Sequence, residues 1–126
     1  AELIGGTYLF KPRTIAGREW PASSYSHGEQ VPVRVADRDH PITRGLEDFV
    51  IHDETYGGLW VAPDVHVLLT TAHPKASPQI TWVREEGRGR VVYIQLGHDD
   101  KAYAHPAFRT LVGRAIHWAA GRPPAP

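Results

Sequence analysis

Only one stretch of the sequence, residues 106–120, has the periodicity of a long amphipathic helix. Pro106 suits the first position of such a helix, and Gly121 suits the position that ends it. The apolar residues between them recur at the spacing of one buried stripe: Phe108, Leu111, Val112, Ala115, Ile116 and Ala119. We therefore predict a C-terminal helix that packs this stripe onto a sheet, with Ile116 and Ala119 among the buried side chains.

Most of the remaining pattern is typical of strands. Residues 31–35 alternate apolar and polar side chains, and residues 49–52 are a second, short candidate. Residues 65–71 are a stronger candidate, because their β-branched run suits burial on both faces. Residues 80–84 and 90–96 flank a loop that contains Gly, which predicts a hairpin. We expect the strands at 65–71 and 90–96 to be central and buried.

Two segments lack such a pattern. Residues 11–30 contain two Pro, two Gly and few apolar side chains, so we interpret them as a loop. Residues 122–126 cannot continue a helix and form a Pro-rich tail. A chain of 126 residues fits one domain, which we place at residues 1–121.

Charge and composition argue against several classes of partner. Fourteen Lys and Arg residues balance fourteen Asp and Glu residues, so no net charge attracts nucleic acid or an anionic membrane surface. No run of about 18 apolar residues could span a bilayer, and the first residues do not resemble a secretory signal. We therefore expect a cytoplasmic chain that binds neither nucleic acid nor membrane. The absence of Cys excludes disulfides and a Cys nucleophile within these residues.

Four segments together resemble the ThuA-like (trehalose utilisation) family. They are residues 40–46 (HPITRGL), 51–56 (IHDETY), 87–99 (GRGRVVYIQLGHD) and 115–121 (AIHWAAG). The resemblance implies an α/β chain with the three-layer fold of flavodoxin-like and class I glutamine amidotransferase-like proteins, in which helices cover both faces of a mostly parallel sheet. It also implies that the chain is the C-terminal portion of such a domain and lacks its N-terminal half. We would then expect an unusual amount of exposed apolar surface.

The resemblance further implies a role in carbohydrate metabolism. The substrate would be a small-molecule sugar, trehalose or a related disaccharide or its keto derivative, and the reaction would be hydrolytic or another acid/base chemistry. Glutamine hydrolysis is a poor expectation, because the family generally lacks the Cys nucleophile of the amidotransferases. The alternative is a noncatalytic sugar-binding or assembly module that retains the fold. A divalent metal cofactor and a homo-oligomer both stay open.

His98 and Asp99 are the first candidate catalytic residues. They directly follow the strand expected at residues 90–96, at its carboxyl end, where open α/β sheets bind their ligands. A neutral imidazole there could act as a general base or a metal ligand, and an adjacent carboxylate could fix its tautomer. The alternative interpretation is a turn in which Asp99 caps the next segment.

His52, Asp53, Glu54 and Tyr56 form the densest group of ionisable side chains. In a strand His52, Glu54 and Tyr56 would share one face, and Asp53 would point to the other. The group could supply metal ligands, His52 among them, with a substrate-binding hydroxyl at Tyr56, or the catalytic acid and base at Glu54 and Asp53. The alternative is a solvated bend in which Asp53 accepts backbone hydrogen bonds.

Other aromatic and His residues give weaker signals. Trp60, beside Gly57 and Gly58, has a flat ring that would suit a sugar and is a candidate for substrate binding. We interpret His27, His73 and His105 as loop residues without a companion carboxylate at an informative spacing.

The two candidate groups are expected to meet. If residues 49–52 and 90–96 run parallel in one sheet, their carboxyl ends lie along the same edge. His52, Glu54, His98 and Asp99 would then converge, although more than forty residues separate the two pairs. Antiparallel strands would place the two pairs at opposite ends of the sheet.

Overall fold

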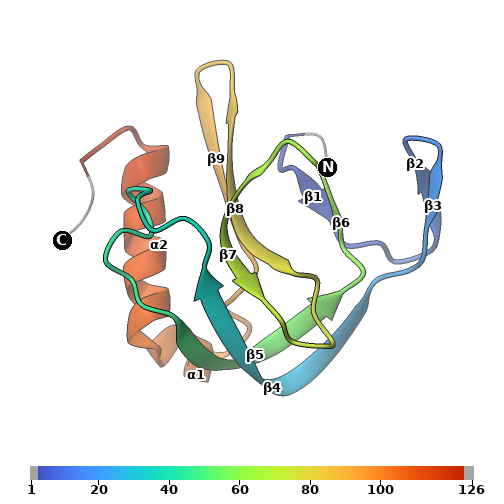
Figure 1. Ribbon diagram of the computed structural model, residues 1–126, viewed down its shortest axis with the longest axis horizontal. Helices are drawn as coiled ribbons and strands as arrows, with labels where there is room; N and C mark the ends of the chain where they lie inside the picture. Colours follow the sequence, from blue (N-terminus) through green and yellow to red (C-terminus); the bar gives the residue numbers. More distant parts are fainter. Residues whose placement is uncertain (1–2, 124–126) are drawn as a thin grey trace.

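The computed structural model describes residues 3–123 (Figure 1). Its main sheet has five strands: β4 (Ser24–Val35), β5 (Phe49–Gly57), β7 (His66–Thr71), β8 (Gln79–Glu86) and β9 (Gly89–Ile94). Two small sheets lie beside it: β1 (Gly6–Thr7) pairs with β6 (Trp60–Val61), and β2 (Arg13–Ile15) pairs with β3 (Arg18–Trp20). The helices α1 (Asp100–Ala104) and α2 (Pro106–Ala119) follow β9.

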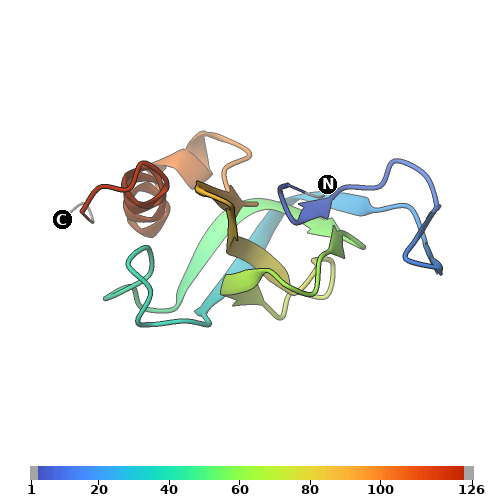
Figure 2. The same ribbon diagram turned by 90° about the horizontal axis from the view of Figure 1, so that it is seen from above.

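The main sheet is antiparallel throughout and strongly curled. Its strand order is β5-β4-β7-β8-β9, and each neighbouring pair is antiparallel. Figures 1 and 2 show how the sheet curves, with α2 at one end of the molecule and the β2–β3 hairpin at the other. Four antiparallel steps separate β5 from β9, so these two edge strands run in the same sense along the sheet.

The core lies between the curled sheet and the two helices. Its largest fully buried members include Ile51 of β5, Leu68 and Leu69 of β7, Ile80 of β8 and Leu111 of α2. Val31, Val33 and Val35 alternate inward along the second half of β4, as a strand with one buried face requires. Burial of side chains of this size stabilises the fold by about 1.5–3 kcal/mol each.

The fold differs from the expected α/β class. A flavodoxin-like or class I glutamine amidotransferase-like three-layer fold needs parallel strands joined by crossover helices on both faces. In the described residues every strand pair is antiparallel, and the helical segments are the five residues of α1 and the fourteen of α2, both after the last strand. The prediction is therefore wrong: the described chain is a mostly β, curled antiparallel sheet.

Individual elements gave mixed outcomes. The strand predicted at 65–71 is confirmed as β7, the middle strand of the sheet, and the predicted hairpin is formed by β8 and β9 over residues 79–94. However, β9 is an edge strand and its residues are only partly buried or exposed, so its prediction as central was wrong. The loop expected at 11–30 contains β2, β3 and the first half of β4.

The predicted helix is confirmed as α2, but its buried stripe is narrower than expected. Phe108, Leu111 and Ala115 are buried, whereas Ile116 is 63% exposed and Ala119 is also exposed. The helix covers only one end of the curled sheet, where it contacts β9. Side chains that turn away from that contact therefore face solvent.

An open, largely apolar groove lies between β9 and α2. It is lined by Val92, Ile94, Val112, Ala115, Ile116 and Ala119. The groove is exposed apolar surface, which the sequence led us to expect in unusual amount. The absence of an N-terminal half stays a prediction, and so do the domain limits at residues 1–121. Residues 124–126 of the expected tail lie outside the described residues. Among the described helices, none is long and apolar enough to cross a membrane.

Candidate functional site

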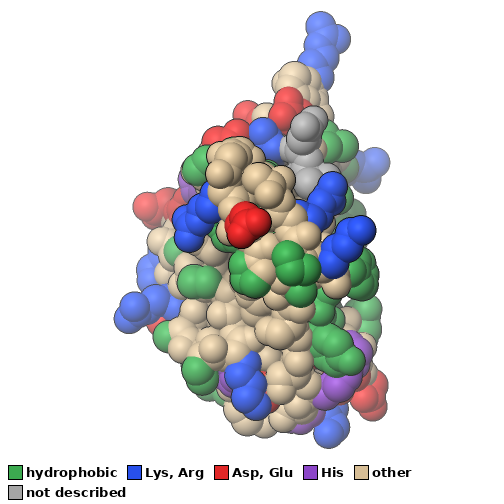
Figure 3. Space-filling view, turned by 90° about the vertical axis from the view of Figure 1, so that its right-hand side faces the viewer, with side chains coloured by type: hydrophobic (Ala, Val, Ile, Leu, Met, Phe, Trp, Pro, Cys, Tyr) green, Lys and Arg blue, Asp and Glu red, His purple; other side chains and the backbone are tan. Residues whose placement is uncertain are grey.

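Glu54 is the centre of the candidate site. Its side chain is only 5% exposed, and Oε2 lies 2.5 Å from Nδ1 of His98 and 3.2 Å from Nδ1 of His27. The centroids of the two imidazole rings lie 5.0 Å apart. The side chain of His27 is 62% exposed and that of His98 is 42% exposed. We call these three residues the His–Glu cluster. In Figure 3, His side chains gather at the lower edge of the visible face beside hydrophobic ones.

A β-bulge places His27 against Glu54. The register of β4 and β5 passes from Ser26 opposite Thr55 to Glu29 opposite Asp53, so His27 and Gly28 together face the single residue Glu54. Such a bulge kinks the strand and redirects its side chains. Gly28 has a φ of +66°, which glycine adopts without strain. The imidazole of His27 thereby reaches a carboxylate that is distant in sequence.

Asp53 places His98. Its carboxylate, 2% exposed, accepts hydrogen bonds from the backbone N–H groups of Gly97 at 2.8 Å and His98 at 3.0 Å. It also accepts one from the N–H of Glu54 at 2.8 Å. Both oxygens of Asp53 are thus occupied by backbone donors, and the segment after β9 is fixed beside the middle of β5. Asp53 is a positioning residue in this geometry. It accepts backbone hydrogen bonds, as in the alternative interpretation, but it is buried within β5 and does not lie in a solvated bend.

Gly97 allows this close approach of the chain to α2. Its φ is +109°, and a Cβ atom there would lie 2.8 Å from Cζ of Phe108. Any other residue would combine a rare backbone conformation with a steric clash. The sequence Gly97-His98 therefore needs its glycine for both backbone and packing reasons.

Asp99 caps a helix. Its Oδ1 accepts hydrogen bonds from the N–H groups of Lys101 and Ala102, and it is the N-cap of α1. The hydrogen bond from Ala102, followed by that from Lys101 and the nearby charge of His52, lowers the pKa of Asp99. The predicted catalytic role of Asp99 gains no support from this geometry, which corresponds to the capping alternative.

His52 and Tyr56 lie on β5 on either side of Glu54 in sequence. Nδ1 of His52 is buried without a hydrogen-bond partner, but His52 is not among the three residues whose ligand atoms cluster. Burial, the charge of Glu54 and a hydrogen bond to Glu54 raise the pKa of Tyr56 to about 12. Tyr56 therefore keeps its proton at neutral pH and remains a hydrogen-bond donor beside the cluster.

The aromatic rings beside the cluster include two that were not predicted. The ring of Tyr25 lies 5.2 Å from that of His27, and the ring of Tyr8 lies 6.2 Å from that of Tyr56. Trp60 belongs to β6 in the small β1–β6 sheet, where it pairs with Thr7, and its role in substrate binding stays a prediction. Tyr25 is 60% exposed and is available to a ligand.

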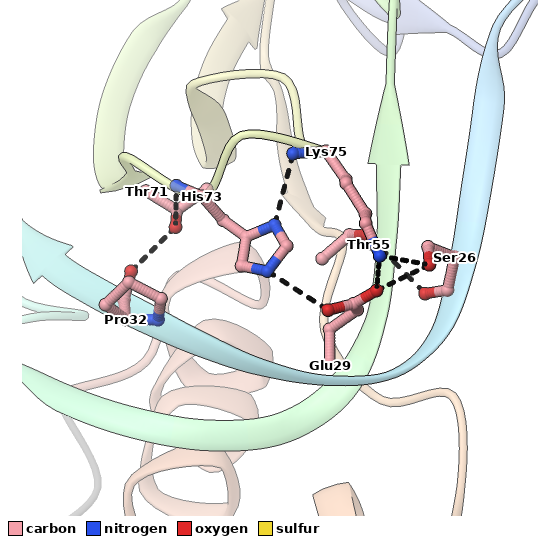
Figure 4. A network of polar contacts seen from close by, with 7 residues as sticks. All are labelled: Ser26, Glu29, Pro32, Thr55, Thr71, His73 and Lys75. Atoms are coloured by element: carbon pink, nitrogen blue, oxygen red, sulfur yellow. Dashed lines mark hydrogen bonds and ion pairs between the residues drawn. The ribbon is translucent and has the colours of Figure 1, made fainter.

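A second polar network connects the bulged part of β4 to the loop after β7 (Figure 4). Glu29 accepts hydrogen bonds from Ser26 and Lys75, and its other oxygen lies 3.3 Å from Nε2 of His73. The bonds from Lys75 and Ser26 lower the pKa of Glu29 to about 2. Thr71 extends the network by donating to the carbonyl of Pro32. The network fastens the loop after β7 to the bulged part of β4.

The structure thus brings together some of the predicted residues and adds others. Glu54 and His98 are in contact, and Asp53 and Asp99 lie beside them as backbone anchors. His27 was missed, because its companion carboxylate is on the neighbouring strand and not nearby in sequence. The signal that could have found it is Gly28, since an isolated Gly in a strand often marks a bulge.

The His–Glu cluster combines the groups needed for proton transfer. Because Nδ1 of His98 faces the carboxylate of Glu54, its Nε2 is free to face a substrate as a base. A buried carboxylate this close to an imidazole stabilises the protonated form of the ring by its charge. The same donor atoms also have the composition of a metal site.

Comparison with known proteins defines the family. The model of the ThuA family, described as trehalose utilisation, matches residues 1–119. The chain therefore belongs to the ThuA family, as the sequence motifs predicted. A search of curated proteins finds no match.

A solved structure supports the fold. The chain is similar to a ThuA-like protein from Parabacteroides merdae, with a TM-score of 0.73 and 20% sequence identity. The match covers 92% of this chain and 50% of the other. The chain thus spans about half the length of this relative.

Proposed function

We propose that the chain acts in carbohydrate metabolism by binding and processing a sugar at the His–Glu cluster. The substrate class is trehalose, a related disaccharide or a keto derivative, and the chemistry is proton transfer. Membership of the trehalose utilisation family supports the carbohydrate role. The observation that carries the site is the contact between the buried carboxylate of Glu54 and the partly exposed imidazole of His98. A cytoplasmic location and a homo-oligomer stay predictions.

In the proposed reaction His98 takes a proton from the sugar. Glu54 stabilises the imidazolium that forms, and Tyr56 keeps its hydroxyl proton as a donor to Glu54. Tyr25, beside His27, offers an exposed aromatic ring of the kind that packs on sugar rings. The cluster does not contain the two free carboxylates of most glycosidases, because backbone donors occupy both oxygens of Asp53.

The alternative is a noncatalytic sugar-binding module. It is favoured by the engagement of Asp53 and Asp99 in backbone hydrogen bonds, which leaves Glu54 as the one carboxylate within the cluster itself. Such a module would bind the sugar without turning it over.

Turnover and binding assays separate the two functions. Chromatography of trehalose and its keto derivative would measure turnover, and calorimetry would measure sugar binding. We expect His98→Ala and Glu54→Gln to lower turnover about 100-fold or more while the fold is retained. His66→Ala is the matched control, since His66 is also exposed and also pairs with a carboxylate, that of Asp37. Binding without turnover would support the module, and neither binding nor turnover would contradict both functions.

A further inference from the structure

We propose that the His–Glu cluster binds one divalent transition-metal ion. The ligands are Nδ1 of His27, Oε2 of Glu54 and Nδ1 of His98. This inference concerns the same residues as the proposed function but does not rest on it, because metal binding can be measured without a sugar.

The three donor atoms already lie close to one another. All are within 4.8 Å of each other, and the two contacts with Glu54 measure 2.5 and 3.2 Å. Zinc binds imidazole nitrogen and carboxylate oxygen at about 2.0–2.2 Å, so ligands of a tetrahedral site lie roughly 3.3 Å apart. Side-chain adjustments of about an ångström would meet this geometry, and both exposed imidazoles are free to make them.

The carboxylate of Glu54 supplies a second, independent observation. Its Oε2 is buried, yet neither close His contact has the geometry of a hydrogen bond. A buried carboxylate oxygen without a hydrogen-bond partner costs free energy, and a bound cation would remove that cost. Two imidazole nitrogens that approach one carboxylate oxygen without hydrogen-bond alignment are arranged as ligands of one shared metal ion would be.

The backbone places two ligands before a metal arrives. His27 is on the bulge that the Glu29 network fastens, and the N–H of His98 is held by Asp53. Glu54 lies between them on β5. Supporting contacts of this kind orient ligands and reduce the cost of ordering them.

The donor set selects the class of metal. Two imidazoles and one carboxylate suit zinc and other divalent transition metals, whereas calcium and magnesium prefer sites built from oxygen alone. Sites with three protein ligands keep a position open for water or substrate. The exposure of His27 and His98 leaves such a position accessible from solvent.

A bound cation would compete for Oε2 of Glu54 with the proton that Glu54 and His98 share in the proposed reaction. With the cation bound, Glu54 and His98 would be among its ligands, and a sugar would approach the open coordination position of the cation. Assays with and without a chelator therefore show which form acts on the sugar. Sugar turnover by a chain that binds no metal would defeat this inference alone, and metal binding without sugar binding would defeat the proposed function alone.

Calorimetry with Zn²⁺ on the metal-free 126-residue chain tests the inference. We expect one ion per chain and an affinity that falls at least about tenfold in His27→Ala and in His98→Ala. His66→Ala is the control and should bind as the original chain does. Co²⁺ should add visible absorption bands that His27→Ala weakens or shifts.

Three results would overturn the inference: no Zn²⁺ binding, equal binding by the original chain and His27→Ala, or an equal loss in His66→Ala. Circular dichroism of each variant would test whether its fold is kept. Because the substituted His27 and His98 side chains are exposed, loss of folding is not the expected cause of weaker binding.

Discussion

The carboxylate of Asp53 in β5 accepts the backbone N–H of His98 at 3.0 Å, across 45 positions of sequence. This contact joins the edge strand β5 to the segment that follows the other edge strand, β9, and sets His98 beside Glu54. The position of His98 therefore depends on a buried acidic residue that holds the backbone.

Asp53→Asn should destabilise the fold. An amide can accept backbone hydrogen bonds through one oxygen only, so its NH₂ group would face a backbone donor. We expect the free energy of unfolding to fall by about 2–3 kcal/mol, as for other buried polar groups left unpaired. Urea denaturation measures this, with the exposed Asp39→Asn as control. Equal stability of the Asp53→Asn variant and the original chain would show that the contact does not hold the sheet.

Two glycines should respond to alanine in opposite directions. Gly97→Ala places a Cβ against Phe108 at a φ of +109°, and we expect a loss of about 2 kcal/mol or more. Gly113→Ala lies within α2 with no atom within 4 Å of the new Cβ, so it should gain about 0.5–1 kcal/mol. Thermal unfolding of both variants measures the contrast. A stabilised Gly97→Ala would contradict the described path of the chain.

The local patterns of the sequence predicted elements better than their arrangement. The apolar run of β7 and the stripe of α2 depend on burial and spacing within one segment, so both were found. Strand direction depends on how the segments are connected, and outside the hairpin of β8 and β9 no local pattern showed that neighbouring strands are antiparallel. The first half of β4, residues 24–30, is largely exposed and shows no alternation, so it was interpreted as a loop.

The site was predicted in part for the same reason. Glu54 and His98 were found as candidates, and β5 and β9 run in the same sense, as their expected meeting required, but the three-layer fold with a parallel sheet was wrong. The curl of an antiparallel sheet brings them together instead. The sequence left open whether Asp53 and Asp99 were catalytic or bound to the backbone, because that depends on donors up to 45 positions away.

Asp48 should make stability depend on pH. Its carboxylate accepts the N–H of Val35 and pairs with Arg38, and the bond from Val35 is the main cause of its lowered pKa. A carboxyl group whose pKa is lower in the folded state stabilises the fold above its unfolded pKa, and this stabilisation is lost as the pH falls through the folded pKa. The difference between the original chain and Asp48→Asn should therefore be full near pH 6 and shrink below the ordinary value of 3.8.

Thermal unfolding of both chains between about pH 2 and pH 7 measures this difference, a range that spans ordinary carboxyl pKa values. The exposed Asp39→Asn again serves as control. A difference that does not change with pH would indicate that the charge of Asp48 contributes nothing to stability.

The central claim is that the curled sheet assembles His27, Glu54 and His98 into one binding site. Anomalous diffraction at the zinc edge, from crystals of the chain grown with Zn²⁺, tests it most directly. The account predicts one strong peak about 2.0–2.2 Å from Nδ1 of His27, Oε2 of Glu54 and Nδ1 of His98. The claim would be contradicted by a zinc peak that lies only elsewhere. It would also be contradicted by a structure that has no zinc peak and in which Glu54 lies apart from both imidazoles.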